Sequence, residues 1–261
     1  QIKKDWPDRA VVVSVMLPMN EKAWADCLPM IEDTGADGFE LNFGCPHGMS
    51  ERGMGAAVGQ VPEYIQMATE WAQAASSIPV IVKLTPNVAS VVPPAKAALD
   101  GGADAVSLIN TINSIMRVDY DTLTMYPTTD GMGTHGGYCG EAVKPIALNM
   151  VAEIARNRET RALPISGIGG VTDWRDAVDF LALGASNVQI CTAAMVYGFK
   201  IIDDLVDGLS TFLDDKGITL DQLVGKAIPS VTDWQYLNLN YVEKAVIDQD
   251  LCIKCGRCHV V

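Results

Sequence analysis

Cysteine, the most reactive side chain in this sequence, occurs in two settings that suit two kinds of chemistry. Cys45 lies in a glycine-bounded stretch, residues 44–48, that directly follows an apolar run. A thiol in such a loop can donate a proton to a bound substrate, although an isolated cysteine is more often a small core residue. Cys252, Cys255 and Cys258 are each separated by two residues, a spacing typical of iron–sulfur ligation, with zinc as the alternative. Cys45 is therefore a candidate catalytic residue, and the three C-terminal cysteines are candidate metal ligands.

Polar side chains and glycines collect at the ends of several apolar runs. They are Asn42 and Cys45, Lys83 and Thr85, Asn110 and Thr111, Gly169 and Gly170, and Cys191 and Thr192. Along residues 38–43 the apolar side chains alternate with Glu40 and Asn42, which therefore share one face of a strand. The carboxyl ends of parallel strands meet at one edge of a sheet, so these residues are expected to build a single site.

Short β-branched runs alternate with longer amphipathic stretches, and this alternation predicts strands and helices. The predicted strands are residues 10–16, 38–43, 79–84, 105–109, 163–166 and 187–191. The predicted helices between them are residues 21–34, 62–76, 89–99, 142–156 and 173–183. Strands and helices in repeated alternation form a parallel sheet. Together with the polar strand ends, the pattern predicts an α/β fold of the (β/α)8 TIM barrel type.

The ends of the last two predicted strands are rich in small residues that expose backbone N–H groups. Residues 166–171 read Ser-Gly-Ile-Gly-Gly-Val, and residues 191–194 read Cys-Thr-Ala-Ala. Such a backbone suits a phosphate group, and the loops after the last two strands of (β/α)8 barrels often bind one. The strands present are therefore expected to be the third to the eighth, so that the barrel is truncated and two strand–helix units precede Gln1.

The domain boundaries follow from these assignments. We expect a partial barrel over residues 1–215, a linker over residues 216–247, and the start of a ferredoxin-like domain over residues 248–261. That last segment is expected to be cut short, because bacterial ferredoxin runs continue to a fourth cysteine. Residues 112–140 form a connection long enough to have a function of its own, such as that of a lid.

Composition and charge narrow the classes of function. With 261 residues and 49% hydrophobic content, the chain can bury a sizeable core. Its 19 basic and 32 acidic side chains give a net charge of −13, which argues against binding to nucleic acid or to anionic membranes. No apolar run reaches membrane-spanning length, and residues 1–20 lack the features of a signal peptide. The cysteine distribution suits a reducing compartment, so a cytoplasmic location is expected.

Residues 40–55 are the most informative segment, and they read Glu-Leu-Asn-Phe-Gly-Cys-Pro-His-Gly-Met-Ser-Glu-Arg-Gly-Met-Gly. This segment resembles the signature of the flavin-containing dihydropyrimidine dehydrogenases, and the resemblance extends over residues 9–258. It is strongest to the FMN- and iron–sulfur-carrying subunit of the NAD-dependent enzymes. The related dihydroorotate dehydrogenases share Asn-x-Ser-Cys-Pro but, as a group, lack the continuation. One departure is Gly44, where the family has serine, so a hydroxyl contact from this position is lost.

The resemblance implies a role for each matching residue. Cys45 is implied to be the general acid. The implied pyrimidine-binding residues are Asn42, the backbone of Phe43 and Gly44, Asn110 and Thr111. The implied FMN-binding residues are Lys83, Gly140, Gly169, Gly170, Val171, Cys191 and Thr192. The implied 4Fe–4S ligands are Cys252, Cys255 and Cys258, with complete clusters expected only in the full-length protein. No role is assigned to His47 beyond shaping its loop.

The activity implied by the resemblance is NAD-dependent reduction of uracil or thymine to the 5,6-dihydropyrimidine. Hydride would pass from FMN to C6, and Cys45 would protonate C5. Electrons would come from NAD and FAD on a partner subunit through iron–sulfur clusters, so a hetero-oligomer is expected. Two alternatives stay open: a dihydroorotate dehydrogenase, which must satisfy a substrate carboxylate, and a non-catalytic electron-transfer subunit, in which the barrel merely holds the ferredoxin arm.

Overall fold

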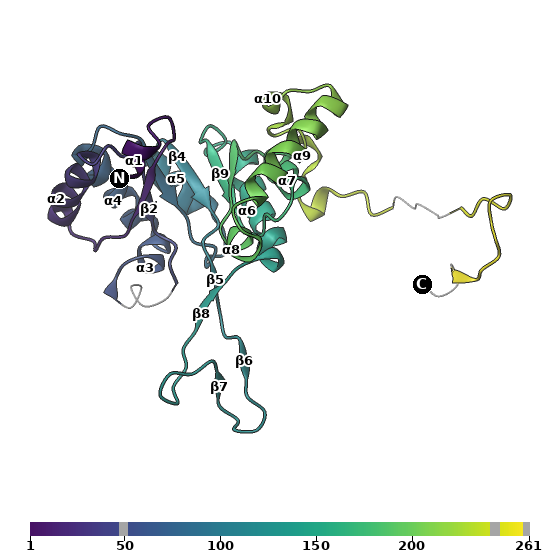
Figure 1. The fold of residues 1–261 in the computed structure, drawn as a ribbon, viewed down its shortest axis with the longest axis horizontal. Coiled ribbons are helices and arrows are strands. Elements are labelled where there is room, and N and C mark those ends of the chain that lie inside the picture. The colour runs from purple at the N-terminus through teal and green to yellow at the C-terminus, as the bar shows by residue number, and fades with distance from the viewer. Residues whose placement is uncertain (47–51, 241–245, 258–261) are drawn as a thin grey trace. The chain divides into compact units, whose positions relative to one another are not determined.

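Six parallel strands form one sheet in the larger of two compact units (Figure 1). The computed structural model describes residues 1–46, 52–240 and 246–257, and it divides into a unit of residues 1–229 and a unit of residues 230–261. The strands are β1 Val12–Val15, β2 Gly38–Asn42, β3 Val80–Lys83, β4 Ala105–Leu108, β9 Ile165–Ile168 and β10 Asn187–Gln189. They lie in the order β1-β2-β3-β4-β9-β10, so each strand of this sheet pairs with the strand of the sheet that precedes it along the chain.

Each predicted strand is confirmed, with small differences at the ends. The largest shift is in β9, which begins at Ile165 and runs on to Ile168. Leu163 instead belongs to a turn, where its N–H donates to the Thr160 carbonyl, and Pro164 has no N–H to donate to a neighbouring strand. The parallel sheet with alternating helices is consistent with part of a (β/α)8 barrel and confirms the predicted fold class.

The predicted helices are present between the strands. They are α2 Glu21–Glu32, α4 Pro62–Ala75, α5 Val92–Asp100, α6 Lys144–Arg156 and α7 Trp174–Ala182, and α9 Ile201–Lys216 follows the last strand. The shorter helices are α1 Ile2–Asp5, α3 Ala56–Gly59, α8 Thr192–Tyr197 and α10 Leu220–Leu223, with 3-10 turns at η2 Glu141–Val143, η3 Ile228–Ser230 and η4 Trp234–Tyr236. Local capping sets some boundaries: the Asn20 side chain accepts a hydrogen bond from the Ala23 N–H at the start of α2.

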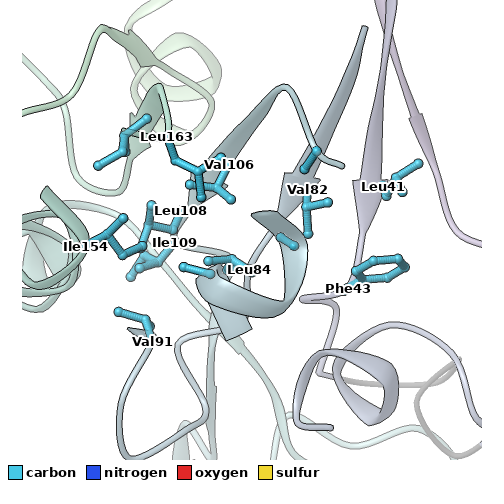
Figure 2. Close-up of a cluster of buried hydrophobic side chains, with 14 of the residues drawn as sticks. Leu41, Phe43, Val82, Leu84, Val91, Val106, Leu108, Ile109, Ile154 and Leu163 are labelled. Carbon is cyan, nitrogen blue, oxygen red and sulfur yellow. The ribbon is translucent and has the colours of Figure 1, made fainter. Parts of the chain in front are cut away.

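The hydrophobic core forms where alternate strand residues face the helices (Figure 2). Leu41, Val82 and Val106 are fully buried on three adjacent strands, and Ile154 of α6 belongs to the same cluster. Burying one such side chain stabilises the fold by roughly 1.5–3 kcal/mol. Because side chains alternate along a strand, the residues between them point to the opposite face of the sheet.

The long connection between β4 and α6 forms an antiparallel arm that projects from the sheet (Figure 1). Its base is β5 Ile112–Ser114 paired with β8 Gly136–Tyr138, and its outer part is β6 Arg117–Val118 paired with β7 Met125–Tyr126. The sequence predicted a long connection here without its strands. These strands are only two or three residues long, too short to produce a recognisable period.

The unit of residues 230–261 contains little regular structure among its described residues. The short 3-10 helix η4 lies wholly within it, whereas η3 crosses its boundary. Across the described ranges, no group of three or more His, Cys, Asp or Glu side chains is arranged to hold a metal ion. Cys258 lies outside the described residues, so the iron–sulfur site stays a prediction. None of the described helices is long and apolar enough to cross a membrane.

Candidate active site

A cavity of about 420 Å³ lies at the carboxyl ends of β3, β4, β9 and β10. Its volume is within the range of about 300–1,000 Å³ that is usual for small-molecule sites. Among its lining residues are Lys83, Asn110, Thr111, Gly140, Gly169, Gly170, Val171, Cys191 and Thr192. The structure therefore brings together every residue expected to bind FMN and two of those expected to bind the pyrimidine.

Two glycine-containing loops form one side of this cavity. Gly140 has a φ of +89° and Gly170 has a φ of +75°, conformations that strongly favour glycine. A Cβ atom on Gly170 would lie 2.9 Å from the Gly140 carbonyl oxygen, so the two loops pack directly against each other. Both loops thus present bare backbone to the cavity, which allows close approach of a ligand.

The face of the sheet opposite the core carries a buried ion pair. The Nζ atom of Lys83 lies 3.3 Å from Oε1 of Glu40 and donates at 3.4 Å to Oε1 of Gln189. Only 7% of Lys83 is exposed, so its charge depends on these partners. The sequence analysis assigned Lys83 to a flavin alone; the structure adds a carboxylate beneath it.

Glu40 is the centre of a hydrogen-bond network that joins several strands. Its Oε2 atom accepts from the Ser107 hydroxyl at 2.7 Å and from Nε2 of Gln189 at 2.9 Å. Burial would raise the pKa of Glu40, but the charge of Lys83 and the hydrogen bonds from Gln189 and Ser107 outweigh it and lower the pKa below its ordinary value. Sequence reasoning gave Glu40 no role. Its strand alternation with Asn42 was the available signal, but only sheet register shows that Ser107 and Gln189 face it.

The loop that carries Cys45 is tied to the cavity through Asn42. The Oδ1 atom of Asn42 accepts from the backbone N–H groups of Gly44 and Cys45, both at 3.2 Å, and from Nδ2 of Asn110 at 2.9 Å. The Cys45 carbonyl in turn accepts from the Ala56 N–H at 2.9 Å. Asn42 therefore joins the half-buried cysteine to a residue of the cavity wall, and its Nδ2 group is the donor that it can offer to a ligand. His47 lies outside the described residues.

Phe43 contributes to the core rather than to the cavity. Its side chain is 1% exposed and makes an edge-on contact with Trp24, with 6.1 Å between the ring centroids. Its N–H donates to the Lys83 carbonyl at 3.1 Å. The backbone contact to substrate expected at Phe43 stays a prediction, and the side chain anchors the loop.

Gly44 has a steric role that the sequence did not reveal. A Cβ atom at this position would lie 2.3 Å from Cβ of Asn110 and 2.5 Å from its Nδ2. The residue that replaces the family's serine therefore makes room for Asn110 to reach Asn42. Without a side chain at Gly44, the loop after β2 and the loop after β4 are in direct contact.

Asn87 holds the loop that contains Thr111, and sequence reasoning missed it. Its Nδ2 atom donates to the Thr111 carbonyl at 3.1 Å and to Oγ1 of Thr85 at 3.1 Å, while its Oδ1 accepts from the Asn113 N–H at 2.9 Å. No motif marked it, because Asn after Pro is a common turn signal. Asn87 thus connects the end of β3 to the segment after β4.

A second hollow, of about 290 Å³, lies beside the Cys45 loop. Its lining residues are Pro46, Ala56, Ala57, Gln60, Asn87, Asn113 and His135. A ring nitrogen of His135, at the base of the arm, lies 3.2 Å from the Pro46 carbonyl oxygen. Amide side chains in this hollow can both donate and accept hydrogen bonds, as the N–H and C=O groups of a pyrimidine require.

The known proteins that this chain resembles are dehydrogenases of pyrimidines. The family model described as dihydroorotate dehydrogenase matches residues 1–213. The NAD-dependent dihydropyrimidine dehydrogenase subunit PreA of Escherichia coli is 38% identical over 261 residues, covering 100% of this chain and 63% of that protein. The chloroplastic dihydropyrimidine dehydrogenase (NADP+) of Arabidopsis thaliana is 38% identical over 262 residues, covering 98% of this chain and 61% of that protein.

Two further relatives carry the dihydroorotate dehydrogenase name. The catalytic subunit of dihydroorotate dehydrogenase B (NAD+) of Thermococcus kodakarensis is 40% identical over 194 residues, covering 74% of this chain and 61% of that protein. The ligand-free dihydroorotate dehydrogenase structure from Eimeria tenella has a TM-score of 0.63 at 20% identity and covers 79% of this chain and 59% of that one, a likeness of fold. The chain thus spans about three-fifths of the length of these relatives.

Proposed function

The chain belongs to the dihydroorotate dehydrogenase family, and from that premise we propose that it is the flavin-binding part of an oxidoreductase that reduces uracil or thymine at the 5,6 bond. The observation that carries the proposal is the hydrogen-bonded link from Cys45 through Asn42 to Asn110. It supports the proposal because it ties the backbone of Cys45, the potential proton donor, to a residue that lines a cavity of cofactor size.

FMN is the cofactor that we propose for the cavity, and the residues present fit it. The wall offers bare backbone at Gly140, Gly169 and Gly170 for a phosphate group. Lys83 also lines the cavity, and although Glu40 balances its charge, its ammonium group can donate a hydrogen bond to the electron-rich edge of a flavin ring. When bound, FMN supplies the hydride that is added to C6 of the pyrimidine.

The remaining chemistry falls to the side chains of this chain. Cys45 donates the proton of its thiol to C5 of the pyrimidine as C6 receives hydride, and the resulting thiolate is reprotonated from solvent. Asn42 holds the loop that carries the thiol and offers its Nδ2 group to the substrate. Asn110 and Thr111 line the cavity and bind the ring carbonyl and N–H groups.

A neutral pyrimidine fits the site better than a carboxylate-bearing one. Among the described residues that line the cavity, Lys83 is the cation, and Glu40 already neutralises it. The hollow beside Cys45 is lined by amides and by His135. For a dihydroorotate dehydrogenase, the described residues that line the cavity offer no second cation to the substrate carboxylate, which makes it the second candidate.

We propose the same electron path for the full-length protein as for the enzymes that the sequence resembles. Electrons enter from NADH through FAD on a partner subunit, within a hetero-oligomer. Cys252, Cys255 and Cys258 contribute to an iron–sulfur cluster at the start of a ferredoxin-like domain. The cysteine spacing supports the cluster.

The test is reconstitution of the full-length protein with FMN and its partner subunit, followed by anaerobic turnover of uracil with NADH as the reductant and, separately, of dihydroorotate with NAD+ as the oxidant. We expect a bound flavin spectrum and uracil reduction that Cys45→Ala slows by about 10²–10⁴. Cys27→Ala, which removes a thiol from α2, is the matched control and should turn over normally. Preference for dihydroorotate would favour the second candidate, and bound flavin without turnover of either compound would favour an electron-transfer subunit.

A further inference from the structure

A lysine at the start of α6 lies where the helix itself disfavours it. Lys144 is the first residue of α6, against the positive end of the helix dipole. Two carboxylates of α7 compensate: Nζ of Lys144 pairs with Oδ1 of Asp176 and lies 2.9 Å from Oδ2 of Asp179. This cation therefore joins the start of α6 to the start of α7.

Asp176 uses its other oxygen to hold the loop that precedes α7. Its Oδ2 atom accepts from the N–H of Thr172 at 2.8 Å, from the Thr172 hydroxyl at 2.8 Å and from the N–H of Asp173 at 3.1 Å. The two preceding glycines and Val171 line the large cavity together with Thr172. One carboxylate thus fixes the end of the loop whose beginning faces the cavity.

The same ion pair also reaches the second glycine loop. Lys144 follows Gly140 by a single 3-10 turn, η2. A Cβ atom on Gly170 would lie 2.9 Å from the Gly140 carbonyl oxygen, 2.9 Å from Cβ of Lys144 and 3.0 Å from the Glu141 carbonyl oxygen. The two loops that present bare backbone to the cavity are therefore packed against each other and joined by one ion pair.

Neither Lys144 nor Asp176 is among the residues that line the cavity. We propose that the Lys144–Asp176 ion pair is the positioning device of the cofactor's phosphate site: it sets the relative placement of the Gly140 and Gly169–Gly170 loops, and it acts on the phosphate only through them. The inference rests on the proposed function, in which FMN occupies this cavity.

The electrostatics of the pair agree with this geometry. Partial burial opposes both charges, yet the hydrogen bonds and charges of Asp176 and Asp179 raise the pKa of Lys144 above its ordinary value. For Asp176 the signs are reversed: burial alone would raise its pKa, but hydrogen bonds from Lys144, Thr172 and Asp173 outweigh burial and lower the pKa. Both side chains are therefore charged at neutral pH.

The test compares two flavins that differ by the phosphate group. Dissociation constants of FMN and riboflavin are measured by flavin fluorescence quenching with the full-length apoprotein at fixed ionic strength. Lys144→Met and Asp176→Asn should each lower the preference for FMN over riboflavin by about tenfold, the equivalent of about 1.4 kcal/mol. Lys144→Arg should restore most of that preference, because it keeps the charge.

Matched controls come from the exposed pair on α5, Lys96 and Asp100. Lys96→Met and Asp100→Asn remove the same groups from a helix away from the cavity wall and should leave the preference unchanged. Thr172→Val keeps the ion pair and removes one hydrogen bond to Asp176, so it provides a milder variant, with an expected loss of about threefold, if the ion-pair variants fail to fold.

The outcomes separate the inference from its premise. Equal losses of FMN and riboflavin affinity, or an unchanged preference in Lys144→Met, Asp176→Asn and Thr172→Val, would overturn the positioning role. Wild-type protein that binds neither flavin would instead overturn the proposed cofactor.

Discussion

Removal of the carboxylate beneath Lys83 should destabilise the protein far more than removal of a surface carboxylate. Glu40→Gln keeps the size of the side chain and one acceptor oxygen but leaves a nearly buried ammonium without its counter-charge. At 3.3 Å and an effective dielectric constant near 20, the lost attraction is about 5 kcal/mol. The side-chain oxygen Oε1 of Gln189, at 3.4 Å from Nζ of Lys83, still accepts a hydrogen bond from the ammonium and replaces part of the lost attraction. We therefore expect a net loss of about 3 kcal/mol, the lower end of the range for a broken buried ion pair.

The assay is urea unfolding of Glu40→Gln, Lys83→Met and the double variant at neutral pH. The double variant should be about 1–3 kcal/mol more stable than the sum of the two single losses implies, because it leaves neither charge unpaired. Asp26→Asn is the control: it breaks an exposed pair with Lys22, whose side chains are 61% and 80% exposed, and should cost less than about 1 kcal/mol. A Glu40→Gln loss as small as that of the control would refute the argument.

The pH dependence gives a second check on the same pair. The folded-state pKa of Glu40 lies below its ordinary value of 4.5 because the charge of Lys83 and the hydrogen bonds from Gln189 and Ser107 outweigh burial. The stability that Glu40 contributes is therefore fully present above pH 4.5 and is lost as the pH falls through the lowered pKa. The difference in unfolding free energy between wild type and Glu40→Gln should shrink in that acidic range and stay constant from pH 6 to 8, where the carboxyl is ionised in both states.

Three other substitutions test the site. Cys45→Ser should keep part of the activity that Cys45→Ala loses, because a hydroxyl is a weaker acid, and neither should change the FMN dissociation constant; loss of FMN from both would show that Cys45 is structural. Asn42→Ala should raise the KM for uracil by roughly tenfold or more, since buried polar groups of substrate lose a partner and the Cys45 loop loses its anchor; an unchanged KM in steady-state assays would exclude that contact. Gly44→Ser should lower stability by about 1–3 kcal/mol, because its Cβ would lie 2.3 Å from Asn110; a Tm equal to wild type would mean that the loop yields at no cost.

Much of the fold was predictable because strand and helix periodicity is local. The alternation of Phe39 and Leu41 with Glu40 and Asn42 identifies a strand and its two faces without knowledge of any neighbour. The short strands of the arm were missed for the same reason: two or three residues carry no period. The boundary of β9 was misplaced because the turn ends at Pro164, inside the apolar run of residues 162–165.

By itself, the sequence determined the succession of strands, the polar strand ends and the glycine loops, since residue type and spacing are enough for each, and it singled out Cys45 as the candidate catalytic residue. Only the tertiary structure decided which charges pair between different strands and helices. Lys83 and Glu40 are 43 residues apart, and Lys144 and Asp176 are 32 residues apart. Parallel strands are joined through helices, so partners on adjacent strands are always remote in sequence, and their contact depends on register and helix packing that no local pattern encodes.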